Sequence, residues 1–225
     1  MGKTNANEAR ELAKNSSDCS FLLTHLVRQN TKRTDDEAKE ILKSILDIDS
    51  YPPSPNLQSS STGWYNSESV SSKLFDPKTT KFILAPKTQC VCFTESTLAG
   101  LKAHKNLFHA KYGLAFDRDL LFSKGAAPCI NIPDKIFREE ISHKGETYKR
   151  HVYNYIPEAL TPFVNIINTS FDATHEREWR VAGDINFFWK DVKFIFCPEQ
   201  DFKIFSKVQI HALPTLFDLE WLDRI

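Results

Sequence analysis

The chain has 225 residues, and its 29 lysine and arginine residues are balanced by 29 aspartate and glutamate residues, so the formal net charge is zero. Proteins that coat nucleic acid through bulk charge are strongly basic, so this balance argues against that class while leaving room for a local basic groove. Hydrophobic residues make up 41% of the chain, which is enough for a packed core and argues against global disorder.

The length predicts one domain with extensions. We expect a polar N-terminal tail at residues 1–18 and a single domain at 19–225, with a Pro/Ser-rich loop at 50–73 that contains Trp64 and Tyr65. Such a loop is either a simple insertion or a segment that folds over a site.

The apolar runs and the cysteines indicate where in the cell the protein is expected. No run approaches the roughly 20 apolar residues of a membrane span, and the polar start shows no secretory signal. The odd number of cysteines, five, predicts free buried thiols. We therefore expect a cytoplasmic protein without a membrane segment.

The first elements have clear local signals. Residues 21–27 form an apolar, strand-like run. Thr34 and Glu37 form a capping box that opens a helix with apolar residues at helical spacing. Further strands are expected at 89–94, 112–116, 128–132, 176–185, 192–197 and 208–213, helices at 98–108, 119–122, 157–167 and 199–206, and a charged helix or loop at 133–151. The strands 176–185 and 192–197 could form a hairpin. Short strands with interspersed helices indicate an α+β protein.

The most informative stretch is His175–Val181, which contains two glutamates. On a strand, Glu176, Glu178 and Arg180 share one face. Neighbouring carboxylates repel, so one of them is expected to have a raised pKa, which is one way in which a site obtains both an ionised and a protonatable carboxyl. The alternative is a solvated edge strand with Glu–Arg pairing.

Two further strands carry polar side chains. His25 follows Thr24 in an apolar strand and needs a polar partner there, as a core or as a functional residue. Thr94 lies at the end of another strand, where Ser96 or Thr97 could N-cap the next helix.

A zinc site must also be considered. Cys90 and Cys92 are followed by His104 and His109 at nearly the spacing of a zinc finger. A single residue between the cysteines leaves too little chain for the usual knuckle turn, so the prediction is that no metal binds.

Together these motifs resemble the bacterial AbiGi-type abortive phage-resistance proteins and a related family with an E-x-E-W-R signature. The matching residues are 91–96 with Leu98, 101–104, 112–116, 124–128 and 176–180, and the resemblance covers roughly residues 20–185. These families are similar to the ADP-ribosyltransferase superfamily. The resemblance implies an ADP-ribosyltransferase-like split β-sandwich with flanking helices, which binds NAD in a cleft between two sheets.

The resemblance also implies roles for individual residues. Glu178 would be the catalytic glutamate, and Glu176 would assist the acceptor. His25 would hold the ribose on the adenosine side of NAD. The remaining cofactor-binding residues would be Thr24 and Thr94, with Phe93 or Tyr112 stacking on nicotinamide.

The implied protein is the toxin of an anti-phage toxin–antitoxin system, with NAD as its substrate. Its partners would be a cognate antitoxin and a chaperone. The acceptor would be RNA, DNA or protein, with nucleic acid slightly favoured because a site can recognise an unstacked base with aromatic side chains. A basic stripe at 135–151 could follow a phosphate backbone, but a solvated face is the favoured interpretation of it. The alternatives are a non-catalytic antitoxin or binding module and a zinc-dependent nucleic-acid-binding module.

Overall fold

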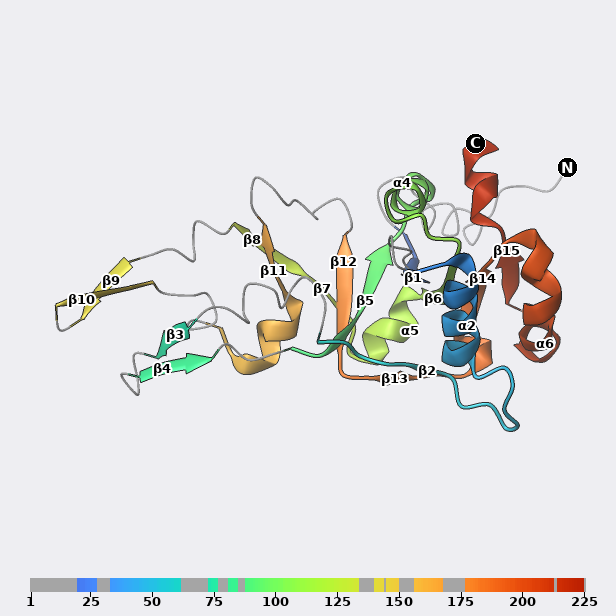
Figure 1. The fold of residues 1–225 in the computed structure, drawn as a ribbon. Helices are drawn as coiled ribbons and strands as arrows, with labels where there is room; N and C mark the ends of the chain where they lie inside the picture. Colours follow the sequence, from blue (N-terminus) through green and yellow to red (C-terminus); the bar gives the residue numbers. More distant parts are fainter. Residues whose placement is uncertain are drawn as a thin grey trace, which may run out of the picture.

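The computed structural model shows an α+β protein in which a mixed seven-stranded sheet is flanked by helices (Figure 1). It describes residues 20–27, 33–61, 73–76, 81–84, 88–133, 140–143, 145–149, 156–167, 177–212 and 214–224. None of the helices in these ranges is long and apolar enough to cross a membrane. The predicted tail at 1–18 lies outside the described residues.

The seven strands run in the order β15-β14-β6-β1-β5-β12-β7. Their bounds are β1 Leu22–Val27, β5 Cys90–Glu95, β6 Tyr112–Asp117, β7 Ala127–Pro128, β12 Glu178–Ala182, β14 Val192–Phe196 and β15 Thr215–Phe217. The pair β14–β15 is parallel, and the other neighbours are antiparallel. The strand β1, which lies fourth in this order, therefore joins the two halves of the sheet.

Helices cover both faces of the sheet. The α-helices are α2 Asp35–Leu46, α4 Leu98–Phe108, α5 Arg118–Ser123 and α6 Phe202–Ala212, and the 3-10 helices are η4 Glu158–Phe163, η6 Trp189–Asp191, η7 Glu199–Asp201 and η8 Leu219–Arg224. Alternation along β1 directs Leu23 and Val27 into the main core with α2, α5 and α6. Leu26 points to the opposite face, into a second cluster with α4 and η8.

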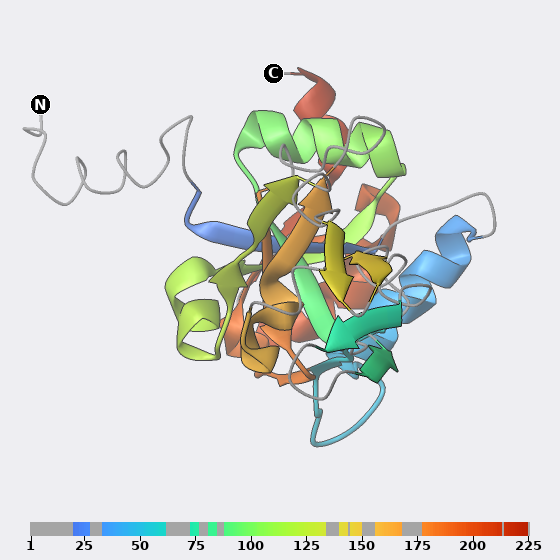
Figure 2. The same ribbon diagram turned by 90° about the vertical axis from the view of Figure 1, so that its left-hand side faces the viewer.

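Four two-stranded sheets complete the fold. They are formed by β2 Asn56–Leu57 with β13 Ile185–Asn186, β3 Lys73–Asp76 with β4 Lys81–Leu84, β8 Ile130–Pro133 with β11 Val164–Ile167, and β9 Glu140–His143 with β10 Glu146–Lys149. Figure 2 shows β8 and β11 side by side, and their register is parallel. In Figure 1 this pair lies beyond β12, so it continues the fold past the main sheet.

Local signals placed several elements correctly. Thr34 and Glu37 form the predicted capping box of α2, with Thr34 Oγ1 accepting from the backbone of Glu37 at 3.2 Å. The second helix begins after Thr97, whose side chain accepts from Gly100 N at 3.1 Å. The predicted helix 98–108 coincides with α4.

Other expectations were wrong in their element type. The helix expected at 157–167 is limited to η4, which contains Pro162, and the chain then enters β11. Residues 208–213 form no strand in their described part, because 208–212 belong to α6. In the charged stretch 133–151, the described residues include the hairpin β9–β10 instead of a helix or loop.

The sequence allowed a hairpin between the strands that are now β12 and β14. They do not form one, because β5, β1 and β6 lie between them in the sheet. The loop expected at 50–73 is partly regular, since β2 pairs with β13, and Ser60 forms an isolated bridge with Cys90. Trp64 and Tyr65 lie outside the described residues.

Candidate functional site

Three predicted site residues lie in one row across neighbouring strands. Thr24 on β1 is opposite Thr94 on β5, and Thr94 is opposite Glu178 on β12. Residues that are directly opposite one another in antiparallel strands point to the same face of a sheet. The fold therefore brings Thr24, Thr94 and Glu178 together on the face that carries α4, although they are separated widely in sequence.

Glu178 is a buried carboxylate with only about 3% of its side chain exposed. Arg180 donates from Nε to Oε1 and from Nη2 to Oε2, both at 2.9 Å, and Asn165 Nδ2 donates to Oε2 at 3.0 Å. The Cys92 thiol, on the neighbouring strand β5, also contributes to the electrostatics of this carboxylate. A carboxylate offers about four acceptor positions, so the three bonds from nitrogen donors leave about one position, at Oε1.

The charge of Arg180 determines the protonation state of Glu178. Burial by itself would raise the pKa of Glu178, but the positive charge and hydrogen bonds of Arg180, with smaller contributions from Cys92 and Asn165, lower it below its ordinary value. Glu178 is therefore ionised at neutral pH. The other carboxylate of the motif, Glu176, lies outside the described residues.

Arg180 connects this carboxylate to the neighbouring β11 segment. Its Nη1 donates to Pro162 O at 2.8 Å and to Val164 O at 3.1 Å, while Nη2 also donates to the side-chain oxygen of Asn165. Together with the bonds to Glu178, these contacts use all five N–H groups of the guanidinium. The sequence placed Arg180 on the face of Glu178, but nothing in it marked Asn165 as their partner.

A cluster of hydroxyl groups adjoins the row. Thr24 Oγ1 and Ser96 Oγ are 2.7 Å apart, and Thr24 Oγ1 donates to Thr94 O at 3.2 Å. Thr94 Oγ1 lies 3.2 Å from Nδ1 of His104, a buried histidine on α4. Sequence reasoning considered His104 only as a zinc ligand, and its contact with Thr94 follows from the packing of α4 on the sheet.

His25 follows the last residue of β1 that is paired with β5, and it points to the opposite face of the sheet from Thr24, beside Phe93. The register of these two strands includes Leu23–Glu95 and Thr24–Thr94 and ends before His25. The His25 Nδ1 lies 2.9 Å from Cys92 O, and because a carbonyl only accepts, Nδ1 carries the proton. The His25 ring also contacts Phe93 in an edge-on arrangement. This polar partner satisfies the requirement that the sequence placed on a histidine in an apolar strand.

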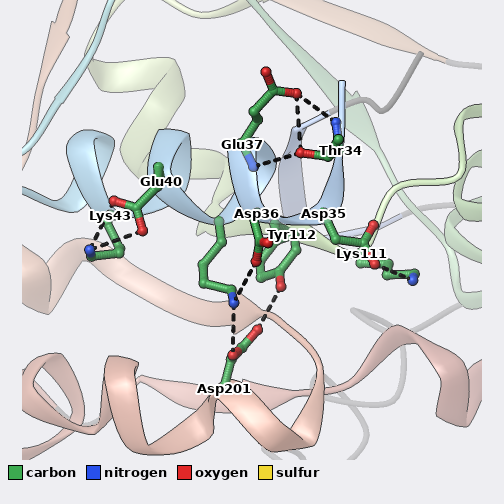
Figure 3. A network of polar contacts seen from close by, with 10 residues as sticks. Thr34, Asp35, Asp36, Glu37, Glu40, Lys43, Lys111, Tyr112 and Asp201 are labelled. Atoms are coloured by element: carbon green, nitrogen blue, oxygen red, sulfur yellow. Dashed lines mark hydrogen bonds and ion pairs between the residues drawn. The ribbon is translucent and has the colours of Figure 1, made fainter. Parts of the chain in front are cut away.

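Phe93 and Tyr112 belong to the main core and not to this row. Both are about 1% exposed. Tyr112 Oη donates to Asp201 Oδ2 at 2.5 Å, and Asp201 also pairs with Lys39 (Figure 3). Burial and this hydrogen bond raise the pKa of Tyr112. Stacking on nicotinamide needs an exposed ring face, which neither residue offers in this structure.

The zinc pattern is not assembled. Cys90 and Cys92 lie along one strand, His104 contacts Thr94, and His109 caps the end of α4. Across the described ranges, which include these four residues, no group of three or more His, Cys, Asp or Glu is arranged to hold a metal ion. A hydrogen bond to Cys90, burial and the charge of Glu178 raise the pKa of the Cys92 thiol well above 9.0, whereas zinc binds the thiolate.

Glu95 is a further buried carboxylate, to which no role was assigned from the sequence. Glu95 lies on the opposite face of β5 from Thr94, and it accepts from Ser20 N and Trp179 Nε1, each at 3.1 Å. The guanidinium groups of Arg118 and Arg177 lie 3.8 and 3.7 Å from its Oε1. Glu95 thus joins the start of the described chain to β12 and α5.

Comparison with protein-family models, curated proteins and solved structures finds no match. The functional argument therefore depends on the residues of the row and their chemistry. The predicted basic stripe does not add to it, because most of its residues lie outside the described ranges.

Proposed function

We propose that this protein is an NAD-dependent ADP-ribosyltransferase that acts as the toxin of a bacterial anti-phage system. The observation that carries the proposal is the row Thr24–Thr94–Glu178, which aligns the residues that the resemblance assigns to NAD binding and catalysis. The likeness to a split β-sandwich is part of the same proposal. It is supported by the end of the paired register between β1 and β5 at Thr24, within the row.

The proposed reaction breaks the bond between nicotinamide and ribose. The bonding electrons leave with nicotinamide and neutralise its ring charge, while positive charge develops on the ribose. Glu178, which is ionised, would accept a hydrogen bond from the ribose 2′-hydroxyl and stabilise that charge in a site of low dielectric constant. The acceptor nucleophile would then bond to the ribose carbon and release its proton to Glu176 acting as general base.

The burial of Glu178 defines how substrate would reach it. Arg180 and Asn165 occupy three acceptor positions of the carboxylate, and a ribose hydroxyl would take the remaining position at Oε1. Thr24 and Thr94 would position the ribose groups of NAD. His25 points to the opposite face of the sheet from Thr24, beside Phe93, so the proposed site does not include His25, Phe93 or Tyr112.

The biological setting follows from the same resemblance. A toxin of this kind acts in the cytoplasm and is silenced by a cognate antitoxin until infection, with a chaperone as a further partner. We favour a nucleic-acid acceptor over a protein acceptor, because a site can recognise an unstacked base through stacking and few hydrogen bonds.

One observation favours a second candidate, a non-catalytic binding module of a defence system. The bonds from Arg180 to Glu178, Asn165 and two backbone carbonyls form a closed network of the kind that connects structural elements. In that case the carboxylate serves the fold and has no reaction to promote.

Labelled NAD distinguishes the two candidates. Wild type and Glu178→Gln are incubated with labelled NAD in a bacterial lysate, and the products are treated with nuclease or protease. The matched control is Glu95→Gln, which removes a buried carboxylate from the neighbouring strand on the opposite face of the sheet. Circular dichroism checks that all three proteins are folded.

The transferase predicts label with wild type and Glu95→Gln and a loss of at least about 100-fold with Glu178→Gln, in the range for removal of a group that stabilises transition-state charge. Nuclease-sensitive label identifies nucleic acid as the acceptor, and protease-sensitive label identifies protein. Equal labelling by wild type and folded Glu178→Gln, or no label under conditions in which wild type is toxic to cells, would leave the binding module as the better explanation.

A further inference from the structure

Within strand β12, Arg180 is the side chain that binds both oxygens of the Glu178 carboxylate. Arg180 lies two residues further along β12 and reaches both carboxylate oxygens at 2.9 Å. Two parallel N–H···O bonds of this kind fix the plane of a carboxylate as well as its position. The rotation of the Glu178 side chain is therefore set by Arg180.

Arg180 is itself fixed from outside the strand. The carbonyls of Pro162 and Val164 accept from Nη1, and Asn165 accepts from Nη2 while donating to Glu178. The Arg180 side chain is fully buried. The backbone of η4 and β11 thus fixes the position of Arg180, and Arg180 fixes the orientation of the carboxylate.

The acceptor positions of the two carboxylate oxygens are used unequally by nitrogen donors. Oε2 accepts from both Arg180 and Asn165, whereas Oε1 accepts from Arg180. Each carboxylate oxygen has about two acceptor positions, so a hydroxyl of a ligand would bind best at Oε1. The network therefore determines which oxygen remains for a ligand.

We propose that Arg180, supported by Asn165, is a positioning residue that holds the Glu178 carboxylate with Oε1 directed to the ribose hydroxyl of NAD. This inference rests on the proposed transferase function and deepens it. Arg180 makes no contact with substrate and acts through Glu178. A buried carboxylate without this cation would take up a proton and lose the charge that stabilises the transition state.

Among the described residues, the other ionisable groups that act on this ion pair are the thiols of Cys92 on β5 and of Cys129 between β7 and β8, and Cys90 acts on Cys92. The pKa of Cys92 is raised, so its thiol is protonated and uncharged at neutral pH. Arg180 therefore supplies the charge that balances Glu178. Asn165, from β11, does not titrate. Arg180 is therefore the dominant cation for the titration of Glu178 among the described neighbours.

The test measures the pKa of Glu178 directly and its effect on rate. Carbon-13 NMR of the glutamate carboxyl groups follows the titration in wild type, Arg180→Gln and Arg180→Lys, with Glu178→Gln used to assign the signal. Labelled-NAD turnover is measured across pH with the same proteins. Asn165→Ala serves as a milder fourth variant in case Arg180→Gln does not fold.

In wild type the carboxyl signal should titrate below its ordinary value of 4.5. In Arg180→Gln it should titrate above that value, and the acid limb of turnover should move upward in pH by the same amount. Arg180→Lys keeps the positive charge but loses the two parallel N–H donors of the guanidinium. The acid limb of its pH–rate profile should therefore lie close to that of wild type, while its kcat stays at least about 10-fold below the wild-type value. Asn165→Ala should move both the signal and the limb upward by a smaller amount.

A role confined to stability would lower turnover equally at every pH and leave the limb in place. That result, or an unchanged pKa of Glu178 in folded Arg180→Gln or Asn165→Ala with normal wild-type labelling, would overturn the positioning role alone. An absence of labelling by wild type would overturn the transferase and with it this role, even if the pKa moved as expected.

Discussion

At the scale of single residues, the ion pair between Glu178 and Arg180 has a consequence for stability. Glu178→Gln would leave the buried guanidinium without its counter-charge, and loss of one partner of such a pair costs about 3–5 kcal/mol. We expect the free energy of unfolding at pH 7, measured with urea, to fall by about 3 kcal/mol. The control is Glu40→Gln on α2, whose exposed pair with Lys43 contributes less than about 1 kcal/mol.

The same pair predicts the direction of the pH dependence. The pKa of Glu178 is lower in the folded protein than its ordinary value of 4.5, so the unfolded chain binds the proton more tightly. The stability from this group is present above pH 4.5 and is lost as the pH falls through the folded pKa. Urea unfolding between pH 5 and the lowest pH at which the protein stays folded should show a shallower decline for Glu178→Gln. Parallel declines for the two proteins would contradict this assignment.

Gly113 is a second residue whose neighbours leave no room for change. A Cβ at this position would lie 2.6 Å from the backbone oxygen of His25 and 3.0 Å from Leu26 Cα. Backbone atoms of a central strand cannot yield cheaply, so Gly113→Ala should cost at least about 2 kcal/mol. Gly100→Ala on α4 is the comparison, because its Cβ meets only the Thr97 hydroxyl at 3.2 Å. Thermal melting of both variants should show a large loss for Gly113→Ala alone.

At the scale of elements, the start of α2 depends on its cap. Thr34→Ala removes the hydroxyl that accepts from the backbone of Glu37, and such losses cost about 1 kcal/mol. Ser44→Ala on the exposed face of the same helix removes a hydroxyl that has no capping role, so it should be neutral or slightly stabilising. A pair of urea titrations in which the two variants behave alike would show that the cap contributes nothing.

Tyr112 connects β6 to the segment that leads into α6 (Figure 3). Tyr112→Phe keeps the ring in the core but removes one donor from the buried carboxylate of Asp201, which retains Lys39 as a partner. We expect a loss of about 1–2 kcal/mol in the free energy of unfolding without loss of NAD labelling. Loss of labelling in a folded Tyr112→Phe protein would return Tyr112 to the candidate site.

At the scale of the whole molecule, the sequence predicted elements better than their partners. The cap of α2, the bounds of α4 and the strand that became β5 follow from local patterns, and the structure confirms them. The contact of Glu178 with Asn165 does not follow from a local pattern, because it depends on how the segment after η4 packs beside β12. Pro162 was the local sign that residues 157–167 do not form one helix.

The same limit applies to the faces of the sheet. Period-two alternation placed Glu178 and Arg180 on one face, and the ion pair confirms it. Phe93 is one residue away from Thr94 and hence on the opposite face, in the core. The resemblance named both for NAD binding without regard to this alternation. Alternation decides which residues of one strand share a face, but strand order decides what packs against that face. Strand order is set by long-range pairing that no local pattern contains.

The proposed function makes a prediction about the folded molecule as a ligand-binding system. If NAD binds the native state, it should stabilise the protein by about 2.7 kcal/mol at 100 times its dissociation constant, and the melting temperature should rise with NAD concentration. Because Glu178 acts mainly on charge that develops during bond breaking, folded Glu178→Gln should retain most of this rise while losing labelling. A rise that AMP reproduces in full would place the binding energy on the adenosine half, and no rise with NAD in wild type would argue against the transferase.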